Sequence, residues 1–345
     1  MSSEPHPDHA FISRIPKVEL HVHLETSLRL RRLLERQNAR GDPPVVAPHL
    51  VADPMKFTGY DRLRRVRYLG RAGVIPDSLY TPENLQQVAW ELLEEAHRQN
   101  VRYLELRVGG RRAFSLLGVR GVVESIYAAC RKAKEMLGVR CGIILTAVRE
   151  RGPEEATRLA EEAVSLQEYG VVGFDLAGDE ANYPPALFSR ASSIAREGGL
   201  GVTVHAGEFA GPASIWTAIY HLGATRIGHG LRAAEDPSLV EVLREQRITL
   251  ELCPTSNLRL GLVSQEAYPL RRFLEAGVPI TINSDDPLLL GIDLTRELQF
   301  ARKAFGLTRE EILSLLETAA QAAFLPPEER EQLLGAIRGF TPVRE

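Results

Sequence analysis

Eight short runs of apolar and β-branched residues recur along this chain of 345 residues, and segments with helical periodicity separate them. The apolar runs are Val18–His23, Val101–Arg107, Cys141–Val148, Val171–Leu176, Gly201–His205, Arg226–His229, Ile248–Cys253 and Pro279–Asn283. The helical segments between them are Glu83–Gln99, Val122–Leu137, Pro153–Tyr169, Ala186–Glu197, Ala213–Leu222, Pro237–Gln246 and Ser264–Glu275. Strands that alternate with helices indicate parallel βαβ units, because parallel neighbours need a crossover connection. Eight such units predict an α/β fold, a closed (β/α)₈ TIM barrel.

Two stretches of the chain are longer than such a barrel requires. The stretch from Thr26 to Thr81 contains the helix breaker Gly41-Asp42-Pro43-Pro44, and it predicts extra helices after the first strand, over the top of the barrel. Four of its apolar residues are candidates for a pocket wall, although ordinary helix packing would account for each of them: Met55, Phe57, Tyr60 and Leu63. At the C-terminus, Thr308 to Phe340 predicts two or three closing helices.

A doubly wound open sheet is the alternative to the barrel. Such sheets often carry a glycine-rich nucleotide-binding fingerprint after the first strand, and no such fingerprint follows the first strand here. The length suits one large domain. We therefore expect a single barrel domain over residues 1–345, with its core at 14–340 and a flexible segment at 1–13.

Charge and composition indicate which partners to expect. The net charge is −3 and the isoelectric point is about 6.4, which gives no electrostatic reason to expect nucleic acid or an anionic membrane. No uninterrupted apolar run approaches the roughly 20 residues of a membrane span, and the polar N-terminus does not resemble a signal peptide. We expect a cytoplasmic protein with a small-molecule partner, no nucleic acid and no membrane; the sequence does not determine its oligomeric state.

The ends of four predicted strands carry side chains suited to metal binding or acid–base chemistry. His21 and His23 lie two residues apart on the first strand, so they point to the same face. Alone, such a pair is also compatible with an ordinary core or surface strand. His205-Ala206-Gly207-Glu208, His229 and Asp285-Asp286 follow later strands in the same way. Because the active site of a (β/α)₈ barrel lies at the C-terminal ends of its strands, the set predicts one site.

Three imidazoles and one carboxylate form a donor set that suits a zinc ion. We predict His21, His23, His205 and Asp285 as the ligands of one metal ion per chain. The same donors also suit Fe²⁺, Co²⁺ or Mn²⁺. Zinc lowers the pKa of a bound water toward about 7, which provides a nucleophile at neutral pH.

Two further side chains are the candidates for acid–base catalysis. Glu208 lies three residues after His205 in a glycine-containing turn, so it can reach a bound reactant without binding the metal. This is the position expected of a general acid or base. His229 stands between two glycines and can orient or deprotonate the attacking water.

Six blocks of the sequence, in order, resemble the adenosine deaminase family of metal-dependent hydrolases. The resemblance extends from Pro16 to about Leu334. The blocks are Pro16–Leu24 (PKVELHVHL), Phe174–Glu180 (FDLAGDE), His205–Glu208 (HAGE), Arg226–Gly230 (RIGHG), Cys253–Asn257 (CPTSN) and Asn283–Pro287 (NSDDP). The family fold is a (β/α)₈ barrel with one zinc ion, which agrees with the pattern of strands and ligands.

The resemblance implies hydrolytic removal of the 6-amino group of a purine, giving a 6-oxopurine and ammonia. Metal-activated water would add at C6 while Glu208 delivers a proton to ring N1. His229 and Asp285 would hold that water. Asp286 would hydrogen-bond N7, and the backbone N–H of Gly178 would donate to N3, where a larger side chain would obstruct the substrate. The resemblance also places His23 at the substrate.

One position departs from the adenosine-deaminating pattern. Members that act on adenosine usually have Asp-Gly after His-x-His-Leu, and the aspartate binds the ribose 5′-hydroxyl; here Glu25-Thr26 stands there. A glutamate resembles the branch that deaminates free adenine. The block Asp175–Glu180 follows the nucleoside branch over a longer stretch, so adenosine and 2′-deoxyadenosine are the favoured substrates. Adenine and a 5′-modified adenosine such as aminofutalosine are the alternatives.

Related barrels with two metal ions need a carboxylated lysine at the end of the fourth strand. No lysine occurs between Lys134 and Lys303, so the sequence favours one metal ion. A catalytically inactive nucleoside-binding protein is a hypothesis of another class. Loss of Glu208 or His229 would favour it, and both are present.

Overall fold

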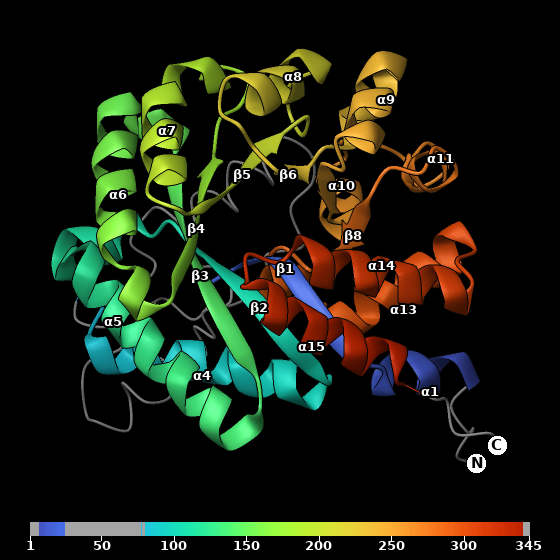
Figure 1. The fold of residues 1–345 in the computed structure, drawn as a ribbon, viewed down its shortest axis with the longest axis horizontal. Coiled ribbons are helices and arrows are strands. Elements are labelled where there is room, and N and C mark those ends of the chain that lie inside the picture. Colours follow the sequence, from blue (N-terminus) through green and yellow to red (C-terminus); the bar gives the residue numbers. More distant parts are fainter. Residues whose placement is uncertain (1–6, 25–76, 78–79, 341–345) are drawn as a thin grey trace, which may run out of the picture.

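The computed structural model describes residues 7–24, 77 and 80–340 of the chain. Eight parallel strands form one sheet in the order β1 to β8, and helices surround them (Figure 1). The strands are β1 (Lys17–His23), β2 (Val101–Val108), β3 (Arg140–Val148), β4 (Val171–Ala177), β5 (Gly201–Ala206), β6 (Arg226–His229), β7 (Thr249–Leu252) and β8 (Ile280–Ile282). This architecture confirms the predicted (β/α)₈ barrel.

The barrel closes between β1 and the segment that follows β8. Val22 and Asp285 form a parallel bridge there. The N–H of His23 donates to the carbonyl of Asp285 (2.9 Å), and the N–H of Asp285 donates to the carbonyl of His21 (3.0 Å). The hydrogen bonds that close the barrel therefore also hold Asp285 beside both histidines of β1.

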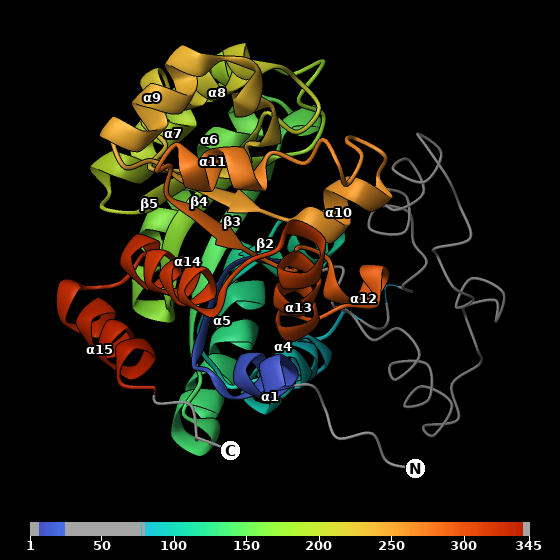
Figure 2. The ribbon, with the colours of Figure 1, turned by 90° about the vertical axis from the view of Figure 1, so that its right-hand side faces the viewer.

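An outer layer of helices covers the strands (Figure 2). In the first seven units these are α4 (Pro82–Arg98), α5 (Arg111–Leu137), α6 (Pro153–Ser165), α7 (Ser189–Glu197), α8 (Pro212–Tyr220), α9 (Pro237–Glu245), α10 (Pro254–Arg259) and α11 (Leu270–Glu275). After β8 come α12 (Pro287–Leu290), α13 (Leu294–Phe305), α14 (Arg309–Ala322) and α15 (Pro327–Arg338). Helix α14 packs against β1 and β8, and α15 packs against α14, so the predicted closing helices are confirmed.

Except for α4, which follows the long stretch after β1, these helices begin soon after their strands. Proline occupies the first turn of α4, α6, α8, α9 and α10, where its fixed φ suits the helix and no N–H is lost. Thr81 and Asp236 cap α4 and α9 by accepting hydrogen bonds from backbone N–H groups. The short connections keep the C-terminal ends of the strands together at one end of the barrel.

The N-terminal segment differs from expectation. We predicted that residues 1–13 are flexible, but Pro7–Arg14 forms helix α1, and Phe11 and Ile12 on it are buried. These apolar side chains hold the helix against the body of the protein, where it contacts α13. The extra helices predicted between Thr26 and Thr81, and their pocket-wall candidates, lie almost wholly outside the described residues.

Helix α5 is long and apolar enough to cross a membrane by length and composition alone. Gly118 interrupts its helical backbone, and the buried face that includes Val123 and Ile126 packs on the barrel. A core helix passes the same test, so this is weak evidence for a membrane span.

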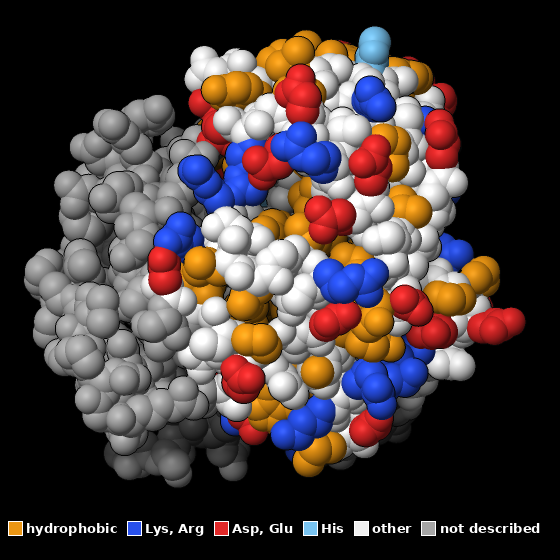
Figure 3. Space-filling view, turned by 90° about the vertical axis from the view of Figure 1, so that its left-hand side faces the viewer, with side chains coloured by type: hydrophobic (Ala, Val, Ile, Leu, Met, Phe, Trp, Pro, Cys, Tyr) orange, Lys and Arg blue, Asp and Glu red, His pale blue; other side chains and the backbone are white. Residues whose placement is uncertain are grey.

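On the face that carries α5 and α6, positive and negative side chains are interspersed (Figure 3). On that face, the described residues thus form no patch of one sign that would attract a polyanion.

Candidate active site

The predicted site residues of the described chain converge at the C-terminal ends of the strands. The imidazole centroids of His21 and His205 lie 4.6 Å apart, and those of His21 and His229 lie 4.9 Å apart. The centroid of His23 lies 5.3 Å from that of His205. Four imidazoles from β1, β5 and β6 therefore share one small volume, which Asp285 joins through the closure of the barrel.

The ring nitrogens face one another in a way that fits a bound cation. His23 Nε2 lies 3.3 Å from His205 Nε2, and Asp285 Oδ1 lies 3.4 Å from His21 Nε2 and 3.5 Å from His23 Nε2. The buried Nε2 of His21 has no hydrogen-bond partner in the described structure. Zinc–nitrogen bonds of about 2.0–2.1 Å place the ligands of a tetrahedral site about 3.3–3.4 Å apart. These three distances match that value closely, so the predicted donor set fits a metal ion.

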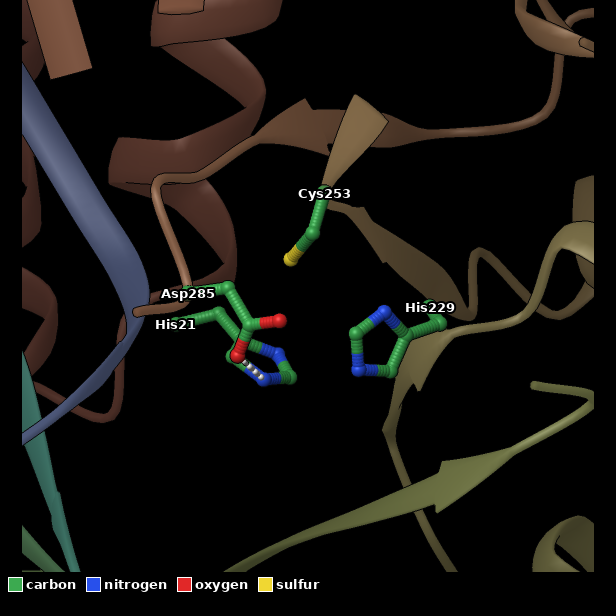
Figure 4. Close-up of side chains that lie close together, drawn as sticks. All are labelled: His21, His229, Cys253 and Asp285. Atoms are coloured by element: carbon green, nitrogen blue, oxygen red, sulfur yellow. Dashed lines mark ion pairs between the residues drawn. The ribbon is translucent and has the colours of Figure 1, made fainter. Parts of the chain in front are cut away.

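A second group of potential donors overlaps the first. His21, His229, Cys253 and Asp285 also lie close together, and Figure 4 shows the thiol of Cys253 directed toward Asp285. Burial raises the pKa of the Cys253 thiol well above its usual range, and its sulfur lies 3.6 Å from the carbonyl oxygen of Glu251. A neutral thiol is a poor ligand, because metals bind the thiolate. The set of His21, His23, His205 and Asp285 is therefore the better metal site.

The protonation states of these groups also suit a metal. Burial lowers the pKa of His23 to about 3 and that of His205 and His229 below the usual histidine value, although neighbouring carboxylates oppose this shift. For His21, burial also acts to lower the pKa, but Asp285 and Glu251 outweigh it and raise the pKa, so His21 must release its proton before it binds a metal. Burial opposes ionisation of Asp285, but its close contact with His21 and the charges of the nearby histidines hold its pKa well below normal. Neutral imidazoles and an ionised carboxylate are the forms that bind metal.

A layer of charged side chains lies directly beneath the histidines. Glu251 of β7 accepts a hydrogen bond from His21 Nδ1 (3.0 Å), and Asp175 of β4 accepts one from His205 Nδ1 (3.1 Å). Arg107 of β2 pairs with both carboxylates: Nη1 lies 2.8 Å from Asp175, and Nη2 contacts Glu251. All three charged side chains are fully buried. Such contacts at Nδ1 fix the ring orientation of His21 and His205, so that Nε2 of each ring can face a metal.

Glu208 and His229 lie beside the donor set, in the positions predicted for catalysis. His229 Nε2 is 3.6 Å from a carboxylate oxygen of Glu208. On its other side, His229 Nδ1 lies 3.1 Å from the amide nitrogen of Asn257, and the hydroxyl of Tyr268 donates to the amide oxygen of Asn257 (3.1 Å). With Nδ1 accepting from this amide, the proton of a neutral His229 is on Nε2, where it faces Glu208.

Two of the site residues adopt backbone conformations that are uncommon outside glycine. His229 has φ of 62° and Asp285 has φ of 60°. Such left-handed conformations cost free energy, and they persist where the surrounding structure enforces them. His229 is the last residue of β6, and Asp285 follows β8 at the bridge to β1, so both lie at the rim of the barrel.

Gly178 has a structural reason to be glycine besides the one predicted. Its φ is 108°, and a Cβ there would lie 2.2 Å from a carboxylate oxygen of Glu150. The glycine is therefore needed for its backbone conformation and for contact with the loop after β3; whether a side chain would also obstruct a substrate stays a prediction. Asp286 is half-buried after β8, next to Asp285. Glu25 lies outside the described residues.

Sequence reasoning missed the layer beneath the histidines. Arg107 and Glu251 stand between apolar residues of their strands, and Asp175 was noted only within a sequence block. The available signal was the presence of charged residues in strands that must face the barrel interior. A (β/α)₈ barrel with such a supported metal site, and with a carboxylate and an imidazole beside it, is typical of metal-dependent hydrolases.

Comparison with known proteins identifies the family. The sequence profile of the adenosine deaminase family matches residues 16–339, and the chain belongs to this family of metal-dependent hydrolytic deaminases. It is 37% identical over 324 residues to the adenosine deaminase of Shigella flexneri, covering 92% of this chain and 96% of that protein. It is 36% identical over 334 residues to the adenosine deaminase of Klebsiella pneumoniae, covering 94% and 98%. The crystal structure of adenine deaminase from Arthrobacter aurescens is similar, with a TM-score of 0.83, 25% identity, and coverage of 94% and 98%.

Proposed function

We propose that the protein is a zinc-dependent deaminase that converts adenosine or 2′-deoxyadenosine and water to the 6-oxopurine nucleoside and ammonia. The observation that carries this proposal is the placement of Glu208 and His229 beside four converging donor atoms. Deamination at C6 requires an activated water on one side of the ring carbon and a proton donor near N1. The site supplies candidates for both.

The residues of the chain have separate roles in this reaction. His21, His23, His205 and Asp285 would hold a zinc ion, which when bound would supply a Lewis acid that makes water acidic enough to react near neutral pH. His229 orients the attacking water. Glu208 gives a proton to N1, so that less negative charge develops on the ring when the new C–O bond forms at C6. The proton that the attacking water loses restores the acid form of Glu208. The C6–N bond then breaks, and the amino group takes the proton of the new C6 hydroxyl and leaves as ammonia, so that C6 becomes a carbonyl.

The remaining contacts orient the purine. The N–H of Gly178 donates to N3, and Asp286 hydrogen-bonds N7. Relatives named as adenosine deaminases share more than a third of their residues with this chain, which supports a nucleoside substrate. The similarity to an adenine deaminase, together with Glu25, supports free adenine as the second candidate. A 5′-modified adenosine such as aminofutalosine is the third.

Steady-state rates on adenosine, 2′-deoxyadenosine, adenine and aminofutalosine test this proposal. Loss of the aminopurine absorbance gives each rate. We expect adenosine to have a kcat/KM well above that of adenine. If adenine is the better substrate, the nucleoside assignment is wrong. If only aminofutalosine reacts, the pocket serves a 5′-modified nucleoside, and if none reacts while nucleosides bind, the protein is a binding protein.

The variant Glu25→Ala sharpens the choice. A carboxylate that accepts a hydrogen bond from a ribose hydroxyl is left unpaired when the sugar is missing. We expect the variant to lose at least about tenfold in kcat/KM for adenosine and to change little for adenine. Equal losses on both substrates would show that Glu25 does not contact the sugar.

The metal is tested separately. Elemental analysis of the purified protein should give about one ion per chain, because one donor set is expected to bind one ion. Two equivalents, or activity that survives thorough chelation, would contradict a single metal site.

A further inference from the structure

The carboxylate of Glu180 receives hydrogen bonds from four consecutive backbone N–H groups in the loop after β5. The N–H of Gly207 donates to Oε1 (2.6 Å). The N–H groups of Glu208, Phe209 and Ala210 donate to Oε2 at 3.1, 2.8 and 3.0 Å. Glu180 is only 3% exposed, so these bonds form in a nearly dry environment. Glu208, the proposed acid, lies inside this run.

The loop is shaped to hold an anion. Gly207 has φ of 69°, and this left-handed residue turns the N–H groups that follow toward one point. A Cβ at Gly207 would lie 2.4 Å from the side chain of Ile215, so another residue would disturb the turn. Buried N–H groups without an acceptor cost about 1–3 kcal/mol each. The loop therefore depends on the carboxylate for its conformation.

Glu180 also joins the segments that follow β4 and β5. The ladder between the two strands consists of Gly173 with Gly201 and Phe174 with Val202, and the side chains of Asp175 and His205 meet beyond it. The backbone pairs end before the rim. Glu180, beyond β4, and the loop beyond β5 meet again at the rim through the four hydrogen bonds. Arg149 reinforces this junction by donating to the carbonyls of His205 and Tyr183, both at 2.7 Å.

This junction connects two groups that would contact one purine ring. Gly178, two residues before Glu180, offers its N–H to N3, and Glu208 offers its proton to N1. N1 and N3 are a fixed distance apart in a rigid ring, so the two loops must keep a fixed relative position. Misplacement of a reacting group by about 1 Å can reduce a rate about 10²-fold.

We propose that Glu180 is a positioning residue that sets Glu208 relative to the Gly178 loop and so determines proton delivery to the purine. This assignment rests on the proposed function. It differs from a general stabilising role, because the effect of Glu180 on the reaction must pass through Glu208. A general stabilising role predicts lower stability with no selective loss of kcat.

The test combines Glu180→Gln with Glu208→Gln. The amide that Glu180→Gln introduces keeps one acceptor oxygen but replaces the other with a donor that repels the N–H groups. We expect Glu180→Gln to lower kcat on adenosine about 10–100-fold with a smaller change in KM. In the Glu208→Gln background the same change should cost less than about threefold, because the acid is already missing. Losses that multiply would overturn the proposal, as would an unchanged kcat in the single variant.

A matched control separates stability from positioning. Asp236 also accepts consecutive backbone N–H groups, from Ser238 (3.0 Å) and Leu239 (3.3 Å), but at the start of α9. Asp236→Asn should lower the unfolding temperature and leave kcat unchanged. If Glu180→Gln does not fold, Glu180→Asp takes its place, because it keeps the charge and shortens the reach. It should lower kcat in the same non-additive way.

A second measurement does not depend on the reaction. Hydrogen exchange followed by mass spectrometry should show faster exchange of the amides of residues 207–210 in Glu180→Gln, with metal content unchanged. Unchanged exchange there would contradict the proposed contact. If no purine is deaminated by the parent protein but exchange changes as expected, the proposed function fails while the loop contact stands.

Discussion

The rim of the barrel and the layer just beneath it use different chemistry to make one site. At the rim, β1, β5, β6 and the segment after β8 present imidazoles and the carboxylate of Asp285. Beneath it, the guanidinium of Arg107 lies between the carboxylates of Asp175 and Glu251, and Glu251 also pairs with Arg226 of β6 (2.7 Å). The rim groups have lone pairs directed at a metal and a substrate. The lower groups direct their charges at one another.

This difference assigns the two layers separate tasks. Burial opposes the charge of Arg107, but Asp175 and Glu251 hold its pKa above the ordinary arginine value. The same guanidinium helps to hold the pKa of Asp175 well below normal. The lower layer therefore stays ionised and fixes the orientation of His21 and His205. The rim groups are then left available for a metal and a substrate, and the two layers should respond differently to substitution.

Replacing the proposed acid should have the largest effect, and it should affect catalysis alone. We expect Glu208→Gln to lower kcat by about 10²–10⁴-fold or more, because a positioned proton donor is lost. Metal content and the unfolding temperature should match the parent. Steady-state kinetics, elemental analysis and thermal unfolding test these three points, and kcat within tenfold of the parent would show that another residue is the acid.

Replacing the centre of the lower layer should instead affect the fold. We expect Arg107→Met to lower the free energy of unfolding by about 3–5 kcal/mol, since Asp175 and Glu251 lose a shared cation while buried. Urea unfolding with chelator present measures this without a contribution from the metal. Arg98→Met is the matched control, because Arg98 pairs with Glu94 and Glu95 at the surface. It should change stability by less than about 1 kcal/mol; equal effects of both variants would remove the distinction between the layers.

A smaller change in the lower layer should weaken metal binding. Asp175→Asn keeps the shape of the side chain but loses the charge that faces His205. Loss of such an outer partner typically costs about 10–100-fold in metal affinity. Competition with a chelator of known affinity measures the change. An affinity equal to that of the parent would mean that His205 is held in place by its backbone and not by Asp175.

The two layers also differ in how far the sequence predicts them. His21, His23, His205 and Asp285 could be assigned because the strand ends of a barrel form its active site, and several metal-binding side chains fall there together. Arg107 and Glu251 lie inside strands that are covered on both faces, and the sequence does not show which charges meet across the interior. Only the pairing of distant strands shows that they face inward and meet. The contact of Gly178 with Glu150 was hidden for the same reason, since it joins two loops.

The smallest expected effect concerns a supporting carboxylate outside the barrel. Glu297 on α13 accepts a hydrogen bond from the N–H of Thr255 (2.7 Å) and another from its hydroxyl. Thr255 begins the segment that carries Asn257, which contacts His229. Burial raises the pKa of Glu297 to about 7, although the bonds from Thr255 oppose the shift. Unlike Asp175 and Glu251, this carboxylate is held by neutral donors, so its ionisation works against the fold.

The sign of the pH effect follows from this raised pKa. The folded protein binds the proton of Glu297 more tightly than the unfolded chain, whose carboxyl has the ordinary pKa of 4.5. The stability that this group contributes is therefore present below about pH 4.5 and is lost as the pH rises through about 7. We expect the stability of Glu297→Gln relative to the parent to increase by about 1 kcal/mol between pH 6 and pH 8, because the variant cannot ionise. Urea unfolding of both proteins at the two pH values isolates this group, since all other titrating groups are shared. A relative stability that falls over the same range would mean that the folded protein favours the ionised carboxylate, and Glu297 would then belong with the paired charges beneath the rim.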